Sequence, residues 1–392
     1  MINIITKLLN DKNIEWKPLG KLLIRTKGTK ITASQMKELH KNDAPLKIFA
    51  GGKTFALVNF DDIPKKDINR EPSIIVKSRG IIEFEYYDKP FSHKNEMWSY
   101  HSKDKNINIK YIYYILKNQE KYFQNLGSKM QMPQIATPDT DKFEIPIPSI
   151  FVQTEIVRIL DTFTALTAEL TAELTTRKKQ YNYYRDKLLT FKDDEVEWKA
   201  LENITLPTSN IKWKETDRAY KYIDLTSVSR ETKSIIETTE ITAINAPSRA
   251  QKIVEENDVI FATTRPTLQR FTLIEKEFSE NIASTGYCVL RANRNYILPK
   301  WIYYNISSTR FNNYVNENQS GTAYPSISDV KVKQFKIPIP PLKEQARIVE
   351  ILDKFDALTN SITEGLPREI ELRQKQYEYY RNLLLDFPKV QE

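Results

Sequence analysis

Along residues 149–191, mostly apolar side chains recur at alternating intervals of four and three residues, which places them on one side of an α-helix. A continuous helix from Ser149 to Thr190 would be roughly 60 Å long, because each residue adds about 1.5 Å. The pattern therefore predicts one long helix with a single apolar seam. The seam positions are Ile156, Leu160, Phe163, Thr167, Leu170, Leu174, Arg177, Tyr181, Tyr184, Leu188 and Phe191.

The C-terminal residues 341–387 repeat this spacing. Gly365 and Pro367 interrupt the pattern, and we expect a break or kink there because proline cannot continue an α-helix without losing a hydrogen bond. The seam positions of this second stretch are Ile348, Leu352, Phe355, Ile362, Leu366, Ile370, Tyr377, Tyr380, Leu384 and Phe387.

The two helical stretches are copies of one sequence. An Ile-Pro-Ile-Pro segment precedes each of them, and Asp161 corresponds to Asp353, 192 residues later. The Lys-Gln-Tyr-x-Tyr-Tyr-Arg blocks at Lys179 and Lys375 lie 196 residues apart, so the later copy carries four extra residues. The residue before a proline is disfavoured in the helical region, so both Ile-Pro-Ile-Pro segments should be extended. Two unrelated surface helices would not share this sequence. We therefore expect the two helical stretches to pair antiparallel with each other.

A second repeat marks the start of each domain. Glu15-Trp-Lys-Pro-Leu is echoed by Glu197-Trp-Lys-Ala-Leu, and the Lys7-Leu-Leu before the first matches the Lys187-Leu-Leu before the second. The N-terminus thus resembles the end of a repeat unit whose front half lies at the C-terminus. This order predicts a pseudo-twofold molecule in which the two ends of the chain meet.

The chain reads as domain, helix, domain, helix, with predicted boundaries at residues 1–144, 145–196, 197–336 and 337–392. The predicted fold class is α+β: two α/β domains separated by two long antiparallel coiled-coil helices. Apolar runs and turn residues predict strands at Leu46–Phe49, Ser73–Val76, Ile81–Tyr86, Tyr222–Leu225, Asp258–Ala262 and Phe271–Ile274, and helical stretches at Ile109 to Gln124 and Pro299 to Val315.

The two domains agree at their ends and differ in their centres. Residues 128–135 align with residues 320–327, again 192 residues later, while the intervening sequences diverge. One scaffold that carries two different recognition heads explains this distribution.

The composition shows a modest excess of positive charge and indicates the cellular compartment of the protein. The 392 residues carry a formal net charge of +8, with a pI near 9.1, a mild indication of a polyanionic partner. Cys288 is the sole cysteine, so a disulfide framework is excluded and a reducing cytoplasm is the expected setting. No apolar run approaches a membrane span, and no membrane partner is expected.

Taken together, these motifs resemble the HsdS specificity subunits of type I restriction-modification systems over essentially the full chain. The resemblance rests on Ile-Pro-Ile-Pro-Pro-Leu-x-Glu-Gln through Ile-Leu-Asp at 337–353 and its weaker copy at 145–161, and on the two Lys-Gln-Tyr blocks. The tandem Thr-Ala-Glu-Leu at 167–174, the tails at 128–135 and 320–327, and the Glu-Trp-Lys starts match as well. The first copy departs at 149–153, where the Pro-Leu-x-Glu-Gln form is replaced.

The resemblance implies a fold, a function and a set of partners. Two target recognition domains, held apart by the conserved helices, would each read one half of a bipartite, asymmetric site in double-stranded DNA. The helices would dock two HsdM methyltransferase subunits, which bind S-adenosylmethionine and methylate adenine. HsdR restriction subunits, which use ATP and Mg²⁺, would complete the nuclease, and no cofactor is expected in this chain itself.

The helices also suggest a ruler. Half-sites one turn of duplex apart lie on one face, some 34–36 Å between centres. One further Thr-Ala-Glu-Leu would lengthen a helix by about 6 Å and turn it by roughly 400°, so that the seam nearly keeps its face. We therefore expect deletion of residues 171–174 to shorten the non-specific spacer and leave both half-sites unchanged.

Candidate DNA contacts come from polar and basic side chains on loops, since base edges are read by Arg, Lys, Asn, Gln and hydroxyl groups. For any single residue, a solvated surface side chain is an equally good interpretation, whereas the two strand-end loops as groups are better candidates for DNA contact. The candidates are Lys77, Ser78, Arg79, Lys94, Lys129, Gln131 and Gln134 in the first domain, and Thr263, Thr264, Arg265, Thr267, Gln269, Arg270, Ser320, Thr322, Tyr324 and Ser326 in the second.

Motifs for chemistry within the chain are missing from the sequence. It lacks the Asn/Asp-Pro-Pro-aromatic motif of an adenine methyltransferase and the phosphate-binding loop of a helicase. Pro138-Asp139 has no Glu-x-Lys at a usable distance, and His40, His93 and His101 show no metal spacing with Cys288. A self-sufficient methyltransferase or nuclease, and a coiled-coil structural protein without sequence preference, remain as the alternatives to a recognition subunit.

Overall fold

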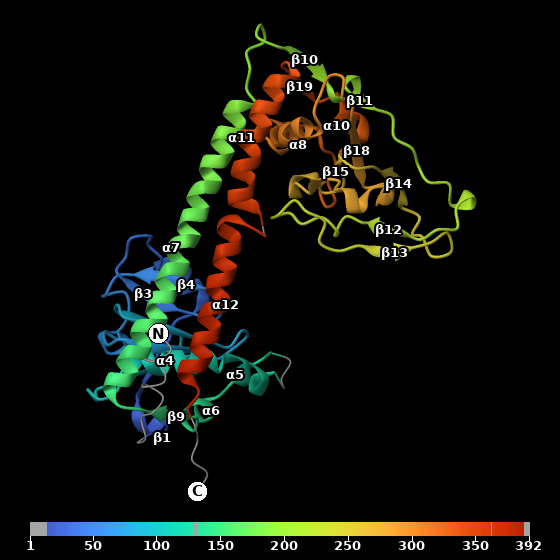
Figure 1. Ribbon diagram of the computed structural model, residues 1–392. Coiled ribbons are helices and arrows are strands. Elements are labelled where there is room, and N and C mark those ends of the chain that lie inside the picture. Colours follow the sequence, from blue (N-terminus) through green and yellow to red (C-terminus); the bar gives the residue numbers. More distant parts are fainter. Residues whose placement is uncertain (1–13, 129–131, 362, 388–392) are drawn as a thin grey trace. The chain divides into compact units, whose positions relative to one another are not determined.

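The computed structural model describes residues 14–128, 132–361 and 363–387. The chain divides into two compact units: unit 1 comprises residues 1–167 with 373–392, and unit 2 comprises residues 168–372. Each unit contains antiparallel sheet, short helices and segments of the long helices (Figure 1). The fold is therefore a mixed α/β fold with two repeated domains.

Unit 1 is built around the four-stranded antiparallel sheet β2-β8-β5-β6. Its strands are β2 (Ile24–Lys27), β8 (Trp98–His101), β5 (Ser73–Lys77) and β6 (Glu83–Tyr87). A second sheet has the order β4-β3-β7 and is formed by β4 (Phe55–Val58), β3 (Leu46–Phe49) and β7 (Phe91–His93), with β3 and β7 parallel. The remaining short helices of the N-terminal half are α2 (Leu19–Leu22), α3 (Ala33–Leu39) and the 3-10 turn η1 (Lys65–Asp67).

One amphipathic helix covers the first sheet of unit 1. In α4 (Ile109–Asn118) the residues Tyr111, Ile112, Ile115 and Leu116 are buried, and the Asn108 side chain caps the helix by accepting from the amides of Lys110 and Tyr111. After a break at Gln119, α5 (Glu120–Gly127) continues, followed by α6 (Thr137–Asp141). The expected single helical stretch from Ile109 to Gln124 is thus two helices.

Unit 2 repeats this plan with a larger second sheet. Its first sheet has the order β11-β18-β15-β16, from β11 (Thr205–Leu206), β18 (Tyr287–Ala292), β15 (Val259–Ala262) and β16 (Phe271–Leu273). The second has the order β13-β12-β17-β14, from β13 (Thr239–Ile241), β12 (Tyr220–Ile223), β17 (Asn281–Ser284) and β14 (Ala250–Val254). The 3-10 turns are η2 (Leu201–Asn203), η3 (Trp213–Glu215), η4 (Pro266–Leu268) and η5 (Lys276–Phe278).

The helices of unit 2 follow the same order as those of unit 1. They are α8 (Pro299–Ser307), α9 (Thr309–Asn318) and α10 (Asp329–Gln334). The expected stretch from Pro299 to Val315 is split at Ser308, because its hydroxyl accepts from the Phe311 amide at 3.2 Å and so begins a new helix. A helix pair next to the first sheet is therefore common to both units.

In each unit the Glu-Trp-Lys segment that begins the domain pairs with the Ile-Pro-Ile-Pro segment that ends it. In unit 1, β1 (Glu15–Pro18) runs antiparallel to β9 (Glu144–Ile147), with Trp16 opposite Pro146. In unit 2, β10 (Glu197–Ala200) pairs in the same way with β19 (Lys336–Ile339), with Trp198 opposite Pro338. The Ile-Pro-Ile-Pro segments are extended, as expected from their prolines.

The first long helix is continuous and the second is broken. The helix α7 runs from Ile150 to Leu188, close to the expected limits. The C-terminal copy forms α11 (Leu342–Asn360) and α12 (Gly365–Leu385), and Gly365 has a φ of +74°. This confirms the break expected from Gly365 and Pro367, because a positive φ is readily adopted only by glycine.

In each unit a segment of α7 packs against a segment of the C-terminal copy (Figure 1). Phe163 stacks on Tyr380 in unit 1, with ring centroids 5.4 Å apart, and Tyr184 stacks on Phe355 in unit 2, with centroids 6.1 Å apart. Phe163 and Phe355 occupy equivalent positions of the two copies, as do Tyr184 and Tyr380. The repeated sequence therefore builds the same aromatic contact twice.

Two repeated side chains attach the helices to the domains. Gln153 donates to the carbonyl of Pro148 at 2.8 Å and accepts from the amide of Asn108 at 2.9 Å. Gln345, its counterpart, donates to Pro340 at 2.8 Å and accepts from Leu298 at 3.0 Å. Residues 149–153 of the first copy depart from the Pro-Leu-x-Glu-Gln pattern, but the glutamine that makes these hydrogen bonds is kept as Gln153.

Candidate nucleic-acid interface

In unit 1 the loop after β5 is joined to the tail loop that follows α5. The amide of Gly80 donates to the carbonyl of Pro133 at 2.8 Å, and the amide of Ile135 donates to Ser78 at 3.0 Å. These bonds flank an antiparallel bridge between Arg79 and Gln134. Two segments separated by more than fifty residues thus form one surface element, and Arg79 is exposed on it.

Two of the candidates on this loop are directed inward. The Lys77 side chain is 7% exposed and its ammonium pairs with Glu85 at 2.8 Å and with Glu83 at 3.3 Å, both on the neighbouring strand. Burial alone would lower the pKa of Lys77, but the two carboxylates outweigh it and raise the pKa. Ser78 is buried and donates to the carbonyl of Glu96 at 2.6 Å. Both side chains hold the loop in place rather than offering a contact to a ligand.

The remaining candidates of unit 1 lie at or outside this element. Lys94 forms an ion pair with Glu96 at 2.7 Å, and Gln134 lies on the tail loop. Lys129 and Gln131 lie outside the described residues. An exposed methionine, Met132, sits on the same tail with 64% of its surface accessible, and Ile81 beside Gly80 is 63% exposed.

Unit 2 builds the same junction from different residues. The amide of Arg265 donates to Pro325 at 2.7 Å, and the amide of Ile327 donates to Thr263 at 2.9 Å. An antiparallel bridge between Thr264 and Ser326 lies between these bonds. The strand-end loop and the tail are therefore joined in both units.

The tail of unit 2 is closed into a tight loop. Ser320 and Ser326 exchange backbone hydrogen bonds of 2.9 Å in both directions, and Gly321 between them has a φ of +93°. Tyr324 projects from this loop with 71% of its surface exposed, and the Arg265 guanidinium lies 4.8 Å from the centroid of its ring. A short closed loop thus presents an aromatic ring stacked with an arginine.

The strand-end loop of unit 2 has a strained backbone. Arg265 and Gln269 flank η4 with φ angles of +48° and +51°, although neither is a glycine. Such residues cost of order 1–3 kcal/mol and are concentrated at functional sites. Here the left-handed conformations turn the chain so that Arg265 and Thr267 face solvent.

Some of the other candidates of unit 2 form hydrogen bonds within the loop, and the rest lie on the surface. Thr263 is buried and donates to the carbonyl of Gly286 at 2.9 Å, Gln269 donates to Pro266 at 3.2 Å, and Arg270 donates to the carbonyl of Leu225. Ser320, Thr322 and Ser326 are exposed along the tail, and Thr264 is half-buried. Arginine, hydroxyl and tyrosine groups on a rigid loop have the chemistry required to contact base edges and phosphates.

The polar and basic pattern of the loops did not predict the exposed apolar and aromatic side chains of the tails. Met132 and Tyr324 are 192 residues apart and therefore occupy the same position of the repeat. The repeat was the available signal, since it aligns Met132 with Tyr324. At both junctions an exposed arginine, Arg79 or Arg265, thus accompanies an exposed apolar or aromatic side chain of the tail, Met132 or Tyr324.

The described residues include no group of three or more His, Cys, Asp or Glu side chains that could hold a metal ion. Cys288 lies buried in β18, and burial raises the pKa of its thiol to about 12. No described helix is long and apolar enough to cross a membrane.

Comparison with known proteins identifies the family. The model of the type I restriction modification DNA specificity domain matches residues 13–177 and again residues 201–372. The chain belongs to this family. The two matches separate the two halves of the repeat, so each half is one copy of the specificity domain.

Curated relatives agree along nearly the whole chain. The specificity subunit of the type I restriction enzyme EcoR124I/EcoR124II of Escherichia coli is 36% identical, covering 98% of this chain and 97% of the relative. A putative type I specificity subunit, S.HindORF215P of Haemophilus influenzae, is 30% identical over 98% of both chains. The crystal structure of the type I restriction-modification S subunit of M. genitalium covers 97% of this chain and 98% of its own with a TM-score of 0.60, and at 18% identity it supports the fold.

Proposed function

We propose that this chain is the DNA-recognition subunit of a type I restriction-modification complex and that each domain reads one half of a bipartite, asymmetric site. The observation that carries the proposal is the matching pair of surface elements, in which Arg79 and Arg265 stand on a strand-end loop joined to a tail. Arginine is the commonest reader of guanine in the major groove. The different side chains around the two arginines account for two different half-sites.

The domains are proposed to be residues 1–144 and 197–336, with helix regions at 145–196 and 337–392 between and after them. The long helices pair antiparallel as a coiled coil, and they relate the two domains by a pseudo-twofold axis. In this arrangement the helices set the distance between the two half-sites. The repeated attachments through Gln153 and Gln345, and the repeated stacks of Phe163 and Phe355, support one common way of mounting each domain on the helices.

The chemistry is proposed to reside in partner subunits. Two HsdM subunits dock on the helices and bring S-adenosylmethionine, and HsdR subunits join through the complex and bring ATP and Mg²⁺. The chain itself contributes sequence preference and geometry and has no catalytic site. The names of its relatives, specificity subunits of type I restriction enzymes, support this division of labour.

Modification mapping tests the proposal. In cells that contain only this chain and its methyltransferase partner, methylated adenines should fall within one bipartite sequence with a spacer of constant length. Substituting Arg79 should alter one half of that sequence, and substituting Arg265 should alter the other half. Methylation without a common sequence would contradict the proposal, and methylation by the purified chain alone would favour a self-sufficient enzyme.

A further inference from the structure

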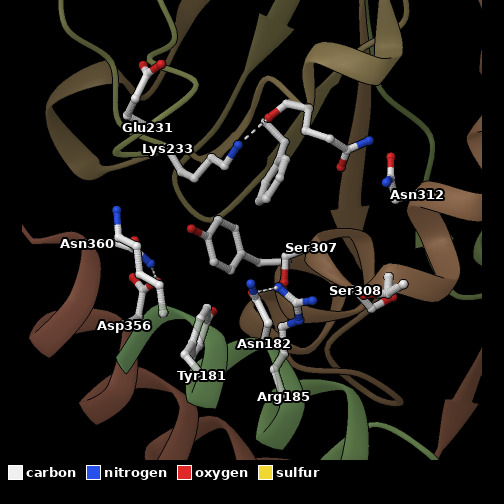
Figure 2. A pocket seen from close by; sticks show the side chains of 15 residues that line it. Tyr181, Asn182, Arg185, Glu231, Lys233, Ser307, Ser308, Asn312, Asp356 and Asn360 are labelled. Atoms are coloured by element: carbon white, nitrogen blue, oxygen red, sulfur yellow. Dashed lines mark hydrogen bonds between the residues drawn. The ribbon is translucent and has the colours of Figure 1, made fainter. Parts of the chain in front are cut away.

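A partly open cavity of about 310 Å³, lined by polar and aromatic side chains, lies within unit 2 (Figure 2). Its walls come from α7, from the last turns of α11, from the junction of α8 and α9, and from the loops that carry Lys233 and Gln269. The volume is at the lower end of the range typical of small-molecule sites.

Lys233 enters this cavity without a carboxylate partner. Its ammonium donates to the carbonyl of Gln269 at 2.5 Å and lies 4.6 Å from the centroid of the Phe271 ring. Among the described residues, none forms an ion pair with Lys233. Its backbone has a φ of +56°, which holds the side chain toward the cavity at a cost in conformational energy. Burial lowers the pKa of Lys233 to about 8, so the protein alone stabilises this charge poorly.

Two further cations line the opposite wall, on one face of α7. The Arg185 side chain is 8% exposed and is held by Asp186 at 2.9 Å and by Asn182 at 3.0 Å. Lys178 lies two turns earlier and has no ion pair among the described residues. Figure 2 shows Lys233 and Arg185 reaching toward the cavity from opposite sides.

The carboxyl groups of the cavity offset this charge only in part. The side chain of Glu231 is 71% exposed, so water screens it. Asp356 is bonded to the Asn360 amide at 2.8 Å, and burial raises the pKa of its carboxyl. Arg185 is already paired with Asp186, so Lys233 and Lys178 are the basic groups of the cavity that have no ion pair among the described residues. They face one screened carboxylate and one carboxyl whose charge is disfavoured by burial.

Part of this cavity is repeated scaffold, because Arg185 and Tyr181 recur as Arg381 and Tyr377, while other lining residues occur only in unit 2. Lys178 corresponds to Gln374 in the C-terminal copy, and Asp356 corresponds to Thr164 in the first copy. The repeated arginine thus belongs to the common scaffold, whereas the lysine at 178 and the carboxyl group at 356 distinguish this wall of unit 2 from its counterpart.

We propose that this cavity binds a phosphate group, with Lys233, Arg185 and Lys178 as its cationic ligands. An anion between these groups would supply the counter-charge that Lys233 lacks. The rings of Phe271, Tyr303 and Tyr181, with the amides of Asn182 and Asn312, give the surroundings in which a nucleotide base can stack and form hydrogen bonds. The phosphate comes either from a free mononucleotide or from the DNA backbone, and the inference does not depend on the DNA recognition proposed above.

Calorimetric titration of the full chain with inorganic phosphate and with adenosine monophosphate tests the proposal. We expect one saturable site, weakened at least tenfold by Lys233→Gln and by Lys178→Gln. Neither lysine forms an ion pair with a residue that the structure describes, and thermal unfolding checks that both variants keep the fold. Lys276→Gln removes the same charge from an exposed position of unit 2 and should leave binding unchanged.

A parallel measurement identifies the source of the phosphate. If the free phosphates do not bind, but Lys233→Gln lowers the DNA affinity of the complete methyltransferase complex about tenfold and reduces the salt slope by about one, the ligand is a DNA phosphate. Unchanged binding of phosphate, nucleotide and DNA in Lys233→Gln overturns the proposal. Equal affinity for chloride would also overturn it, because it would show only unselective attraction to positive charge.

Discussion

Tyr304 donates its hydroxyl hydrogen to Asp353 at 2.5 Å, and the same carboxylate accepts from Lys300 at 2.7 Å. Unit 1 repeats this arrangement, with Tyr114 at 2.5 Å and Lys110 at 2.8 Å from Asp161. Burial, followed by the bond to the carboxylate, raises the pKa of both tyrosines. Both tyrosines therefore stay protonated as donors, and in each unit one carboxylate joins a domain helix to a long helix.

Replacing either tyrosine by phenylalanine should destabilise its own unit. Tyr304→Phe removes the donor and leaves Asp353 with Lys300 and water, so we expect a loss of about 1–2 kcal/mol in the free energy of unfolding. Tyr114→Phe should cost a similar amount, because the bond is the same. Urea unfolding measures both. Tyr379→Phe, on a side chain that is 63% exposed, is the control and should change little.

Alanine at Gly365 should be poorly tolerated. A Cβ there would lie 2.7 Å from the carbonyl oxygen of Leu358 and closer still to that of Ala357, and the φ of +74° disfavours any L side chain. We expect Gly365→Ala to lower the free energy of unfolding by more than about 1 kcal/mol. Gly51→Ala, where no atom lies within 4 Å of a Cβ and φ is not positive, is the matched control. Equal stability of the two variants would contradict a requirement for glycine at the break between α11 and α12.

Deleting one Thr-Ala-Glu-Leu, residues 171–174, should shorten the spacer between the half-sites. The helix α7 is continuous through this segment, so four residues remove about 6 Å, a little under two base-pair steps. Methylation mapping should show both half-sites unchanged, since the reading loops are untouched. Glu169→Gln keeps the length of the helix and should keep the spacer. A changed half-site in the deletion would rule out a ruler.

The two exposed arginines should act on separate half-sites. Removing the guanidinium in Arg265→Ala should cost about 1–3 kcal/mol of discrimination at one position of one half-site, and Arg79→Ala should do the same in the other. Arg294→Ala, at an exposed position of unit 2, should leave the mapped sequence intact. If Arg265 contacts only phosphate, its loss will weaken binding to all sequences alike and lower the salt slope instead.

Lys233 should make stability depend on pH in the alkaline range. Its pKa is lowered to about 8 in the folded protein, chiefly by burial, while the unfolded chain keeps about 10.4. Between these values the unfolded state binds more protons, so this group makes unfolding less favourable as pH rises from about 8 to 10. The nearby charges are Glu231, Arg230 and Arg185. In urea unfolding, the free energy of unfolding of wild type relative to that of Lys233→Met should rise across this interval. A difference that does not change with pH would contradict a lowered pKa of Lys233.

Much of the architecture could be predicted because repeats and periodicity are properties of the chain itself. Strand Leu46–Phe49 matches its expected limits, the long helix ends close to its expected residues, and the break at Gly365 is confirmed. Other limits were wrong by a few residues: β6 begins at Glu83 rather than Ile81, and β12 ends at Ile223 rather than Leu225. Strand ends depend on which neighbour supplies hydrogen bonds, and that neighbour is distant in sequence.

The sequence by itself determined the family, the repeated plan and the candidate loops, because motifs that recur at a constant spacing can be recognised without knowing the fold. Only the tertiary structure decided which candidates face outward. Lys77 and Arg79 differ by two positions, yet Lys77 is withdrawn by Glu85 on the adjacent strand, and Arg79 is held outward by its bridge to Gln134. The cavity around Lys233 also required the fold, because its walls come from residues 178 to 360, and burial and counter-charge arise only when such distant segments pack together.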